Sequence, residues 1–338
     1  MATIKEVAAH AGVSVATVSR VVNNNGYVSE DLRQRVLEAM NILDYKPSAL
    51  ARSLRRQESL TVGLLMPGMN QPFFATLAYV IQKTLFASGY RVIICSSEES
   101  GEMEAAYVDM LIRQRVDGAI VVPTGHGSET IQPLLAKMPV VLVDRDLPDL
   151  EVSRILADNF QGGYEAMNHL LLLGHREIAL IGSLLHLAAM DQRIAGAKKA
   201  YGDTGLPLDS LRVLMAGRSE FDLGYTSALD VLSGSIRPTA VFALTDVIAI
   251  GAMHAAAELG LRLPEDLSVI GFDDIPLASY IIPSLTTVAQ PIQTMGANAA
   301  KLLLQRFKTG RSEPYEKIVH DMRLMIRAST TSLVRLRA

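Results

Sequence analysis

The spacing of apolar residues changes once along this chain, near residue 60. Before that point, apolar residues recur every three or four positions, which predicts three short amphipathic helices within residues 3–45. Thr3 and Glu6 make a capping box at the start of the first helix, and a serine N-cap precedes the second, residues 15–23. The N-terminal part is therefore predicted to be a small all-α head.

Beyond residue 60, short continuous apolar runs alternate with longer amphipathic stretches. Runs of strand length separated by helices are typical of parallel sheets that are covered on both faces. The predicted strands are residues 60–66, 91–95, 119–122 and 140–143, followed by 178–181, 212–215, 240–244 and 268–271. Because the pattern runs twice, we expect two α/β lobes that face a cleft. Residues 286–330 have strand–helix–strand character and could return the chain to the first lobe.

The net charge of the chain is −3, but the charges are unevenly distributed. Residues 1–58 contain eight lysines and arginines against six acidic residues, whereas the remainder contains twenty-four against twenty-nine. Lys46, Arg52, Arg55 and Arg56 stand in one short stretch without an acid between them. A local basic patch attracts phosphate whatever the total charge is, so nucleic acid is a candidate partner of the N-terminal part.

Other features of the composition narrow the function classes. Cys95 is the single cysteine and cannot form an internal disulfide, so we expect a reducing cytoplasm. The N-terminus lacks the pattern of a signal peptide, and no apolar run has the length of a membrane span. Phosphate-loop, serine-hydrolase and zinc-ligand motifs are missing, so we expect no enzyme activity, no cofactor and no metal.

The first two predicted helices have the arrangement of a helix-turn-helix, whose second helix enters the major groove of DNA. Val18 and Val21 are predicted to be buried in this second helix. Arg20 is the best candidate for a bidentate guanine contact, and Val15 or Ala16 can contact a thymine methyl group. The alternative is a small helical domain that binds protein, with Arg20 merely solvated.

Short motifs spread over the chain carry a family resemblance. They are residues 2–8 (ATIKEVA), 11–23 (AGVSVATVSRVVN), 45–54 (YKPSALARSL), Gly174-His175-Arg176, Thr245-Asp246, residues 271–274 (GFDD), residues 285–288 (LTTV) and Gln290-Pro291. In this order they closely resemble the lactose-repressor/galactose-repressor family, particularly its purine- and ribose-repressor branch. The resemblance runs the full length of the chain.

The resemblance implies a domain organisation. We expect a helix-turn-helix DNA-binding domain at residues 1–46, a hinge helix and linker at 47–58, and a two-lobed body at 59–338. The body is expected to be periplasmic-binding-protein-like, with doubly wound parallel sheets. Lobe one would comprise about 59–158 and 292–325, and lobe two about 159–291 and 326–338.

The resemblance also implies which residues contact DNA. In the family, the hinge helices of a dimer pair in the minor groove and each inserts a leucine between base steps, and Leu54 matches that leucine. The alternative for Leu54 is an ordinary linker leucine. The expected DNA-binding residues are Thr3, Ser14, Val15, Ala16, Thr17, Ser19, Arg20, Asn24, Tyr45, Ser48, Ala51, Arg52, Leu54 and Arg55.

The resemblance also implies which residues contact the effector, and it places them on loops at the carboxyl ends of the strands. They are Phe73, Phe74, Asp144, Arg193, Ser219, Phe221, Thr245, Asp246, Asp273 and Gln290. Carboxylates, a guanidinium and aromatic rings suit a polyhydroxylated ligand. For each charged residue the alternative is a salt bridge or a capping role, and for Asp246 a helix cap is favoured. Asp274 is interpreted as structural.

Residues 184–189 (LLHLAA) depart from the family pattern, because they are apolar where purine-binding relatives place polar ligand contacts. This departure favours a sugar or sugar derivative as effector. The sequence thus predicts a cytoplasmic, nucleoid-associated repressor that binds palindromic operator DNA as a homodimer under control of a small molecule. The alternatives are a regulator that responds to a purine corepressor or to a protein partner, and a solute sensor that does not bind DNA.

Overall fold

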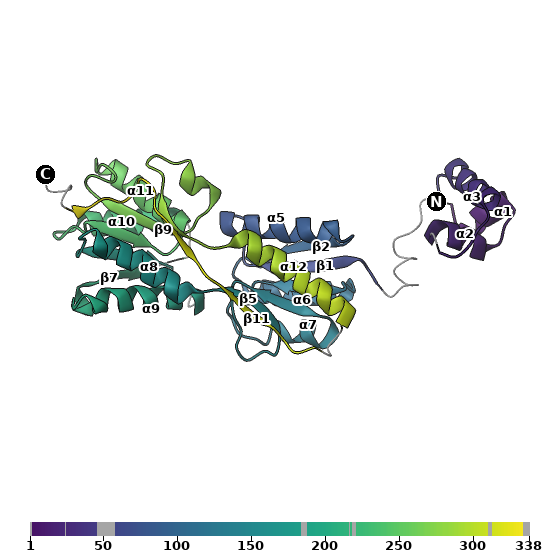
Figure 1. The fold of residues 1–338 in the computed structure, drawn as a ribbon, viewed down its shortest axis with the longest axis horizontal. Helices are drawn as coiled ribbons and strands as arrows, with labels where there is room; N and C mark the ends of the chain where they lie inside the picture. The colour runs from purple at the N-terminus through teal and green to yellow at the C-terminus, as the bar shows by residue number, and fades with distance from the viewer. Residues whose placement is uncertain are drawn as a thin grey trace. The chain divides into compact units, whose positions relative to one another are not determined.

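The computed structural model of this 338-residue chain contains two compact units, residues 1–60 and 61–338. The residues that the structure describes are 2–23, 25–45, 58–183, 188–215, 217, 221–309 and 313–333. Figure 1 shows the helices α1, α2 and α3 in the small unit and layered helices and strands in the larger one. No helix in these described ranges is both long enough and apolar enough to cross a membrane.

The small unit, here called the head, has the three predicted helices. They are α1 (Ile4–Ala11), α2 (Val15–Asn23) and α3 (Glu30–Ile42). Their apolar faces meet in one small core formed by Val7, Ala8, Ala11, Val18, Val21, Val36 and Ala39. The helical spacing read from the sequence is therefore confirmed.

Local contacts fix the angle between the first two helices. The Thr3 hydroxyl accepts from the Glu6 backbone N–H, and the Glu6 carboxylate accepts from the Thr3 N–H at 2.7 Å, so the capping box is confirmed. Gly12 follows α1 with φ of 62°, which glycine adopts without strain. Arg35 of α3 donates to the Ala11 carbonyl at 2.7 Å and so holds this turn in place.

The first sheet of the larger unit has the strand order β11-β5-β4-β3-β1-β2, with all strands parallel. Its strands are β1 (Thr61–Met66), β2 (Arg91–Ser96), β3 (Gly118–Val121), β4 (Val140–Val143), β5 (Ser153–Ala157) and β11 (Lys317–His320). The helices of this lobe are α5 (Pro72–Ala87), α6 (Gly101–Arg113), α7 (Gln132–Lys137) and α12 (Ile292–Thr309).

The second sheet repeats this order as β12-β10-β9-β8-β6-β7, with only the β10–β12 pair antiparallel. Its strands are β6 (Ile178–Gly182), β7 (Arg212–Met215), β8 (Ala240–Ala243), β9 (Ser268–Asp273), β10 (Thr286–Ala289) and β12 (Arg323–Met325). Its helices are α8 (Asn159–Leu172), α9 (Ala188–Asp203), α10 (Phe221–Ser233) and α11 (Asp246–Glu258), with short 3-10 turns at Leu208–Ser210 and Pro276–Ser279.

All eight strands predicted from apolar runs are present, and the doubly wound fold is confirmed. Among the described residues, the strand β5, the short helix α7 and the 3-10 turns were not predicted. The final strand was expected to be one element, but the structure divides it between the sheets, with β11 in the first and β12 in the second. The chain therefore leaves the first lobe after His320, a few residues before the expected boundary at about 325.

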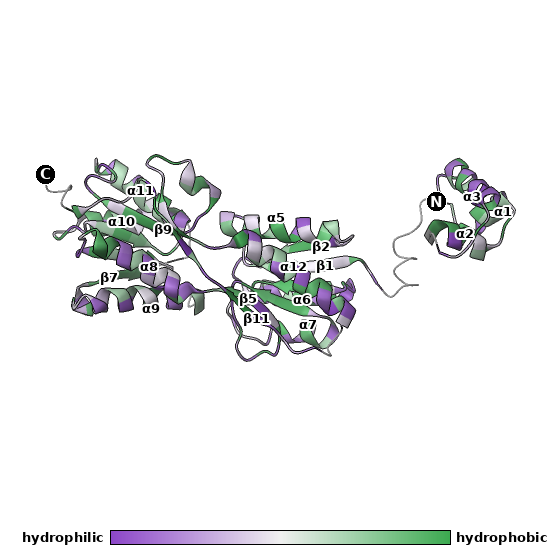
Figure 2. Cartoon of the chain, viewed as in Figure 1, coloured by the Kyte–Doolittle hydropathy of each residue, from purple (hydrophilic) through white to green (hydrophobic). Residues whose placement is uncertain are grey.

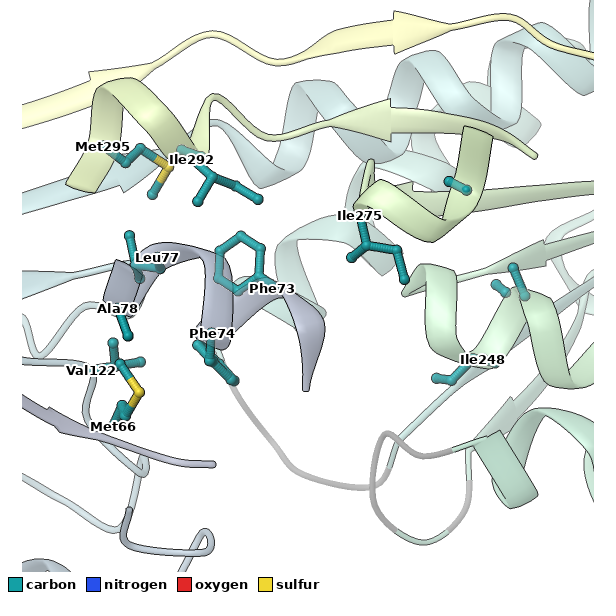
Figure 3. Packing of buried hydrophobic residues seen from close by; sticks show 14 of the residues in the cluster. Met66, Phe73, Phe74, Leu77, Ala78, Val122, Ile248, Ile275, Ile292 and Met295 are labelled. Atoms are coloured by element: carbon teal, nitrogen blue, oxygen red, sulfur yellow. The ribbon is translucent and has the colours of Figure 1, made fainter. Parts of the chain in front are cut away.

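The central strands of each sheet, such as β3 and β8, are buried on both faces, which explains why they are continuously apolar. In β1, Leu64 and Met66 face one buried cluster whereas Leu65 faces another. Figure 2 shows the strands of both lobes as largely hydrophobic and the helices as mixed, because each helix buries one face. Figure 3 shows how Phe73 and Phe74 of α5 reach the edge of this packing, with Phe73 lying between Ile292 and Ile275.

Candidate ligand cleft and nucleic-acid interface

The strand order creates a point in each sheet where neighbouring connections diverge. In the first sheet this point lies between β1 and β3, and in the second between β6 and β8. In open α/β sheets, ligands bind in the crevice outside the carboxyl ends of the strands at such points. The structure has a cavity there, with about 450 Å³ of space free of atoms when the part open to solvent is counted.

The cavity is lined by residues that follow strands of both sheets. The described lining residues are Gln71, Phe73, Phe74, Glu99, Asp144, Arg145, Ser183, Ala189, Met190, Arg193, Thr245, Asp273 and Gln290. Most of the residues expected to contact the effector are thus brought together from distant parts of the chain. They are Phe73, Phe74, Asp144, Arg193, Thr245, Asp273 and Gln290.

Arg193 is the most extensively bonded of these side chains, although it is only 3% exposed. Its Nε donates to Asn159 Oδ1 at 2.8 Å, and its Nη1 donates to the Leu244 carbonyl at 2.6 Å. Nη1 also lies 3.4 Å from Asp273 Oδ1, and the guanidinium stacks 3.7 Å above the centre of the Phe272 ring. One arginine therefore joins the starts of α8 and α11 to the end of β9.

Close packing of α9 against α8 holds Arg193 at this position. A Cβ atom on Gly163 would lie 2.1 Å from the Arg193 carbonyl oxygen, and one on Gly196 would lie 1.9 Å from that of Phe160. Real atoms do not approach so closely, so only glycine allows the two helix backbones to touch. The small residues thus place the cleft arginine without contacting the cleft themselves.

Asp246, expected at the site, is not among the described residues that line the cavity. Its carboxylate accepts from the Ile275 backbone N–H at 2.8 Å and from the Thr287 hydroxyl at 2.5 Å. The expected capping role is also wrong, since the Thr245 hydroxyl is the N-cap of α11 and accepts from Ile248 N–H at 3.3 Å. Asp246 instead holds the turn that follows Asp273.

Phe221 and Ser219 are the two remaining residues that were expected to contact the effector. Phe221 begins α10, is 42% exposed, and is not among the described residues that line the cavity. Ser219 lies outside the described residues. Asp274, interpreted as structural, pairs with Arg327 at 2.6 Å, as expected.

Sequence reasoning missed an ion pair in the cleft. Arg145 donates from both Nη atoms to the two oxygens of Glu99, each at 2.8 Å, and also to the Pro123 carbonyl at 2.9 Å. Its guanidinium lies 5.4 Å from the centre of the Phe74 ring. Glu99 and Arg145 both come shortly after parallel strands, and this position was the signal that could have identified them.

Several buried polar atoms in the cleft have no partner among the residues that the structure describes. They are Asp144 Oδ1, Ser183 Oγ and Gln290 Oε1. Buried polar atoms are normally hydrogen-bonded, because desolvation without a partner costs about 1–3 kcal/mol per group. Their convergence on one cavity indicates a ligand that offers hydrogen-bond donors.

Burial changes the acid–base properties of the cleft. It raises the pKa of Asp273 to about 6, against the opposing charge of Arg193. Burial also raises the pKa of Asp144, opposed first by Arg145, and lowers the pKa of Arg193, opposed first by Asp273. Burial therefore disfavours the charged forms of these groups, and the opposite charges around them offset part of that cost.

In the head, the described DNA-contact candidates of α2 point away from the core. Ser14, Val15, Ala16 and Arg20 are exposed and Thr17 and Ser19 are half-buried, whereas Val18 is fully buried. The Ser14 hydroxyl accepts from the Thr17 N–H at 3.1 Å, as expected for the N-cap of α2. Thr3 caps α1, and Tyr45 packs against the core of the head. The candidates outside the described residues are Asn24, Ser48, Ala51, Arg52, Leu54 and Arg55.

Comparisons with known proteins agree with this architecture. Residues 3–48 match the family model "Bacterial regulatory proteins, lacI family", and residues 167–330 match "Periplasmic binding protein-like domain". The HTH-type transcriptional repressor PurR of Edwardsiella ictaluri is 38% identical over 324 residues, which cover 95% of this chain and 94% of the relative. The chain belongs to the LacI family. It is a DNA-binding repressor with a ligand-binding domain.

Other LacI-family proteins support the same assignment. PurR of Photorhabdus laumondii is 38% identical over 332 residues, covering 97% of each chain. A LacI family transcriptional regulator from Enterococcus faecium, solved with bound ribose, has 34% identity and a TM-score of 0.75, covering 80% of this chain and 99% of that one. The lac repressor dimer bound to operator and the anti-inducer ONPF has 28% identity and a TM-score of 0.86, covering 98% and 99%.

Proposed function

We propose that this LacI-family repressor binds a palindromic operator as a homodimer and that a neutral sugar in the cleft changes its affinity for the operator. The observation that carries the effector class is the convergence of Asp144 Oδ1, Ser183 Oγ and Gln290 Oε1, which lack partners among the described residues. Sugar hydroxyls can donate to all three, and aromatic side chains commonly pack against a sugar ring. Phe73 and Phe74 supply such faces, with ring centres 5.2 Å apart.

Ribose is our first candidate, because the Enterococcus faecium regulator that resembles this chain was solved with ribose. A purine is the second candidate, because the curated relatives are PurR repressors. The apolar residues 184–189 argue against a purine, because purine-binding relatives are expected to place polar ligand contacts in this segment. We assign no catalytic activity and no cofactor, and we place the repressor with DNA in the bacterial cytoplasm.

For DNA, we propose that α2 lies in the major groove and that Arg20 contacts a guanine. Exposure of Arg20 beside the fully buried Val18 supports this orientation of the helix. The basic stretch around Arg52 and Arg55 would meet the minor groove, with Leu54 as the wedge. Dimerisation is supported by the lac repressor structure, which is a dimer on its operator.

Thermal unfolding of the full chain tests the effector class. Ribose, other neutral pentoses and hexoses, and purine bases are added separately. A ligand that binds only the folded state at 100 times its Kd stabilises that state by about 2.7 kcal/mol. We expect a raised Tm with a neutral sugar, and stabilisation by purines alone would overturn the proposal.

A selection from random double-stranded DNA tests the operator claim. We expect enriched sequences to be palindromic, and the sugar found above to change their affinity for the repressor. Arg20→Ala and Leu54→Ala should both weaken specific binding, and added salt should weaken it steeply through counterion release. Arg113→Ala is the control, because this arginine is exposed in the ligand-binding unit. No enrichment over random DNA would contradict the proposal.

A further inference from the structure

Glu99 holds the guanidinium of Arg145 in a single orientation at the wall of the cleft. The two side chains are 7% and 9% exposed, and both carboxylate oxygens accept from Arg145 at 2.8 Å. The Pro123 carbonyl and the Phe74 ring occupy further sides of the same guanidinium. A bidentate pair with this geometry uses the face with which arginine otherwise binds carboxylate or phosphate groups.

The charges of the cleft are unequal. Among the described lining residues, Glu99, Asp144 and Asp273 are acidic, whereas Arg145 and Arg193 are basic. Asp273 lies 3.4 Å from Arg193, and Glu99 pairs with Arg145. Asp144 is the third acidic residue. Its Oδ2 lies 3.9 Å from Arg145 Nε, and its Oδ1 has no hydrogen-bond partner among the described residues. With all five ionised, the cleft carries one excess negative charge.

We propose that Glu99 is a specificity-determining positioning residue, which keeps anionic ligands out of the cleft by occupying the guanidinium of Arg145. The inference rests on the proposed function in taking this cleft as the effector site, and it narrows the effector to uncharged sugars. A sugar phosphate or sugar acid would meet three acidic side chains against two basic ones, and would find Arg145 already paired with Glu99. Rejection by an unfavourable charge is an effective route to specificity.

The variant Glu99→Gln separates this role from a purely structural one. Glutamine keeps the size of the side chain and removes its charge, so Arg145 becomes available to an anion. Glu98→Gln is the matched control, since it makes the same charge change on the neighbouring residue, whose side chain is exposed. A purely structural role of Glu99 would weaken the binding of charged and uncharged ligands alike, and would leave their ratio unchanged.

The first measurement needs no knowledge of the effector. The Tm of wild type, Glu98→Gln and Glu99→Gln is measured in sodium phosphate and in sodium chloride of equal ionic strength. We expect phosphate to raise the Tm of Glu99→Gln but not that of wild type or Glu98→Gln. The double variant Glu99→Gln/Arg145→Gln should lose this increase in Tm. Equal responses in the three proteins would overturn the inference, and they would leave the proposed sugar effector untouched.

The second measurement compares ribose with ribose 5-phosphate by calorimetry. We expect wild type to bind ribose at least tenfold more tightly than ribose 5-phosphate, and Glu99→Gln to reduce that ratio about tenfold or more, because the freed guanidinium can pair with phosphate. If wild type binds ribose 5-phosphate more tightly than ribose, the inference is overturned. This result needs no variant, so it can be obtained even if Glu99→Gln does not fold. If wild type binds neither compound but Glu99→Gln gains phosphate binding, the inference stands and ribose fails as effector.

Discussion

In the head, the described residues proposed to contact DNA lie mostly on the single helix α2 and point into solvent. The cleft instead gathers its residues from the ends of seven strands and from α9, and buries most of them. Arg20 is exposed, but Arg193 is 3% exposed and engages Asn159, Leu244 and Asp273. A residue of the first kind can change without disturbing the fold. A residue of the second kind supports the fold and, in the proposed site, the binding of ligand.

The largest expected effect is that of Arg193→Ala. Removing one partner of a buried ion pair leaves an uncompensated charge, so the free energy of unfolding should fall by about 3–5 kcal/mol. The measurement is urea unfolding of the full chain followed by circular dichroism. Lys199→Ala is the control on the same helix, because its pair with Asp203 is exposed, and it should leave stability unchanged. Equal stability of the two variants would refute the buried network.

A smaller effect is expected from Gly196→Ala, which places a Cβ atom 1.9 Å from the Phe160 carbonyl oxygen. The helices α8 and α9 must separate, at a cost of about 1–3 kcal/mol in the free energy of unfolding. Sugar affinity should fall as well, because α9 carries Arg193. Gly202→Ala is the matched control in α9, where the nearest atom lies 3.8 Å away, and it should be neutral or stabilising.

In the head, Arg20→Ala should leave the Tm unchanged and reduce operator affinity by about 1–3 kcal/mol, the value of one bidentate base contact. The measurement is a gel shift with the selected operator. Val18→Ala, two residues earlier, provides the contrast, because Val18 is fully buried and its loss should destabilise the head itself. A lower Tm in Arg20→Ala would show that the two regions differ less than proposed.

The smallest effect concerns pH. Burial raises the pKa of Asp273 to about 6 from its ordinary value of 3.8, so the folded state binds its proton more tightly than the unfolded state. This group therefore contributes stability at low pH that is lost as the pH rises through 6. Relative to Asp273→Asn, wild type should lose about 1 kcal/mol between pH 5 and pH 7.

The comparison with Asp273→Asn is needed because His169 and His175 act in the opposite direction. Burial lowers the pKa of both, so their contribution is present above pH 6.5 and is lost as the pH falls. Both histidines are present in wild type and variant, and their effects cancel in the difference. A difference that does not depend on pH would show that Asp273 is already ionised at pH 5.

Much of the fold could be predicted from the spacing of apolar residues. The strand β4 begins and ends at the residues predicted, because a strand buried on both faces must be apolar throughout. The half-buried edge strand β7 also has the predicted bounds. The strand β5 was missed because Ser153 and Arg154 interrupt its apolar run. Arg154 is tolerated there because its side chain bonds to Asp146 and to the carbonyls of nearby loops, which the sequence does not reveal.

The sequence by itself determined most of the order of helices and strands, the exposed face of α2 and, through the family resemblance, most of the cleft residues. The tertiary structure alone decided the roles of Asp246, Glu99 and Arg145. Asp246 turned out to brace a turn, whereas Glu99 and Arg145 pair across the cleft wall. The physical reason is distance along the chain. Helix caps and apolar spacing act within a few residues, whereas an ion pair between residues 99 and 145 exists only after the sheet has brought their strands together.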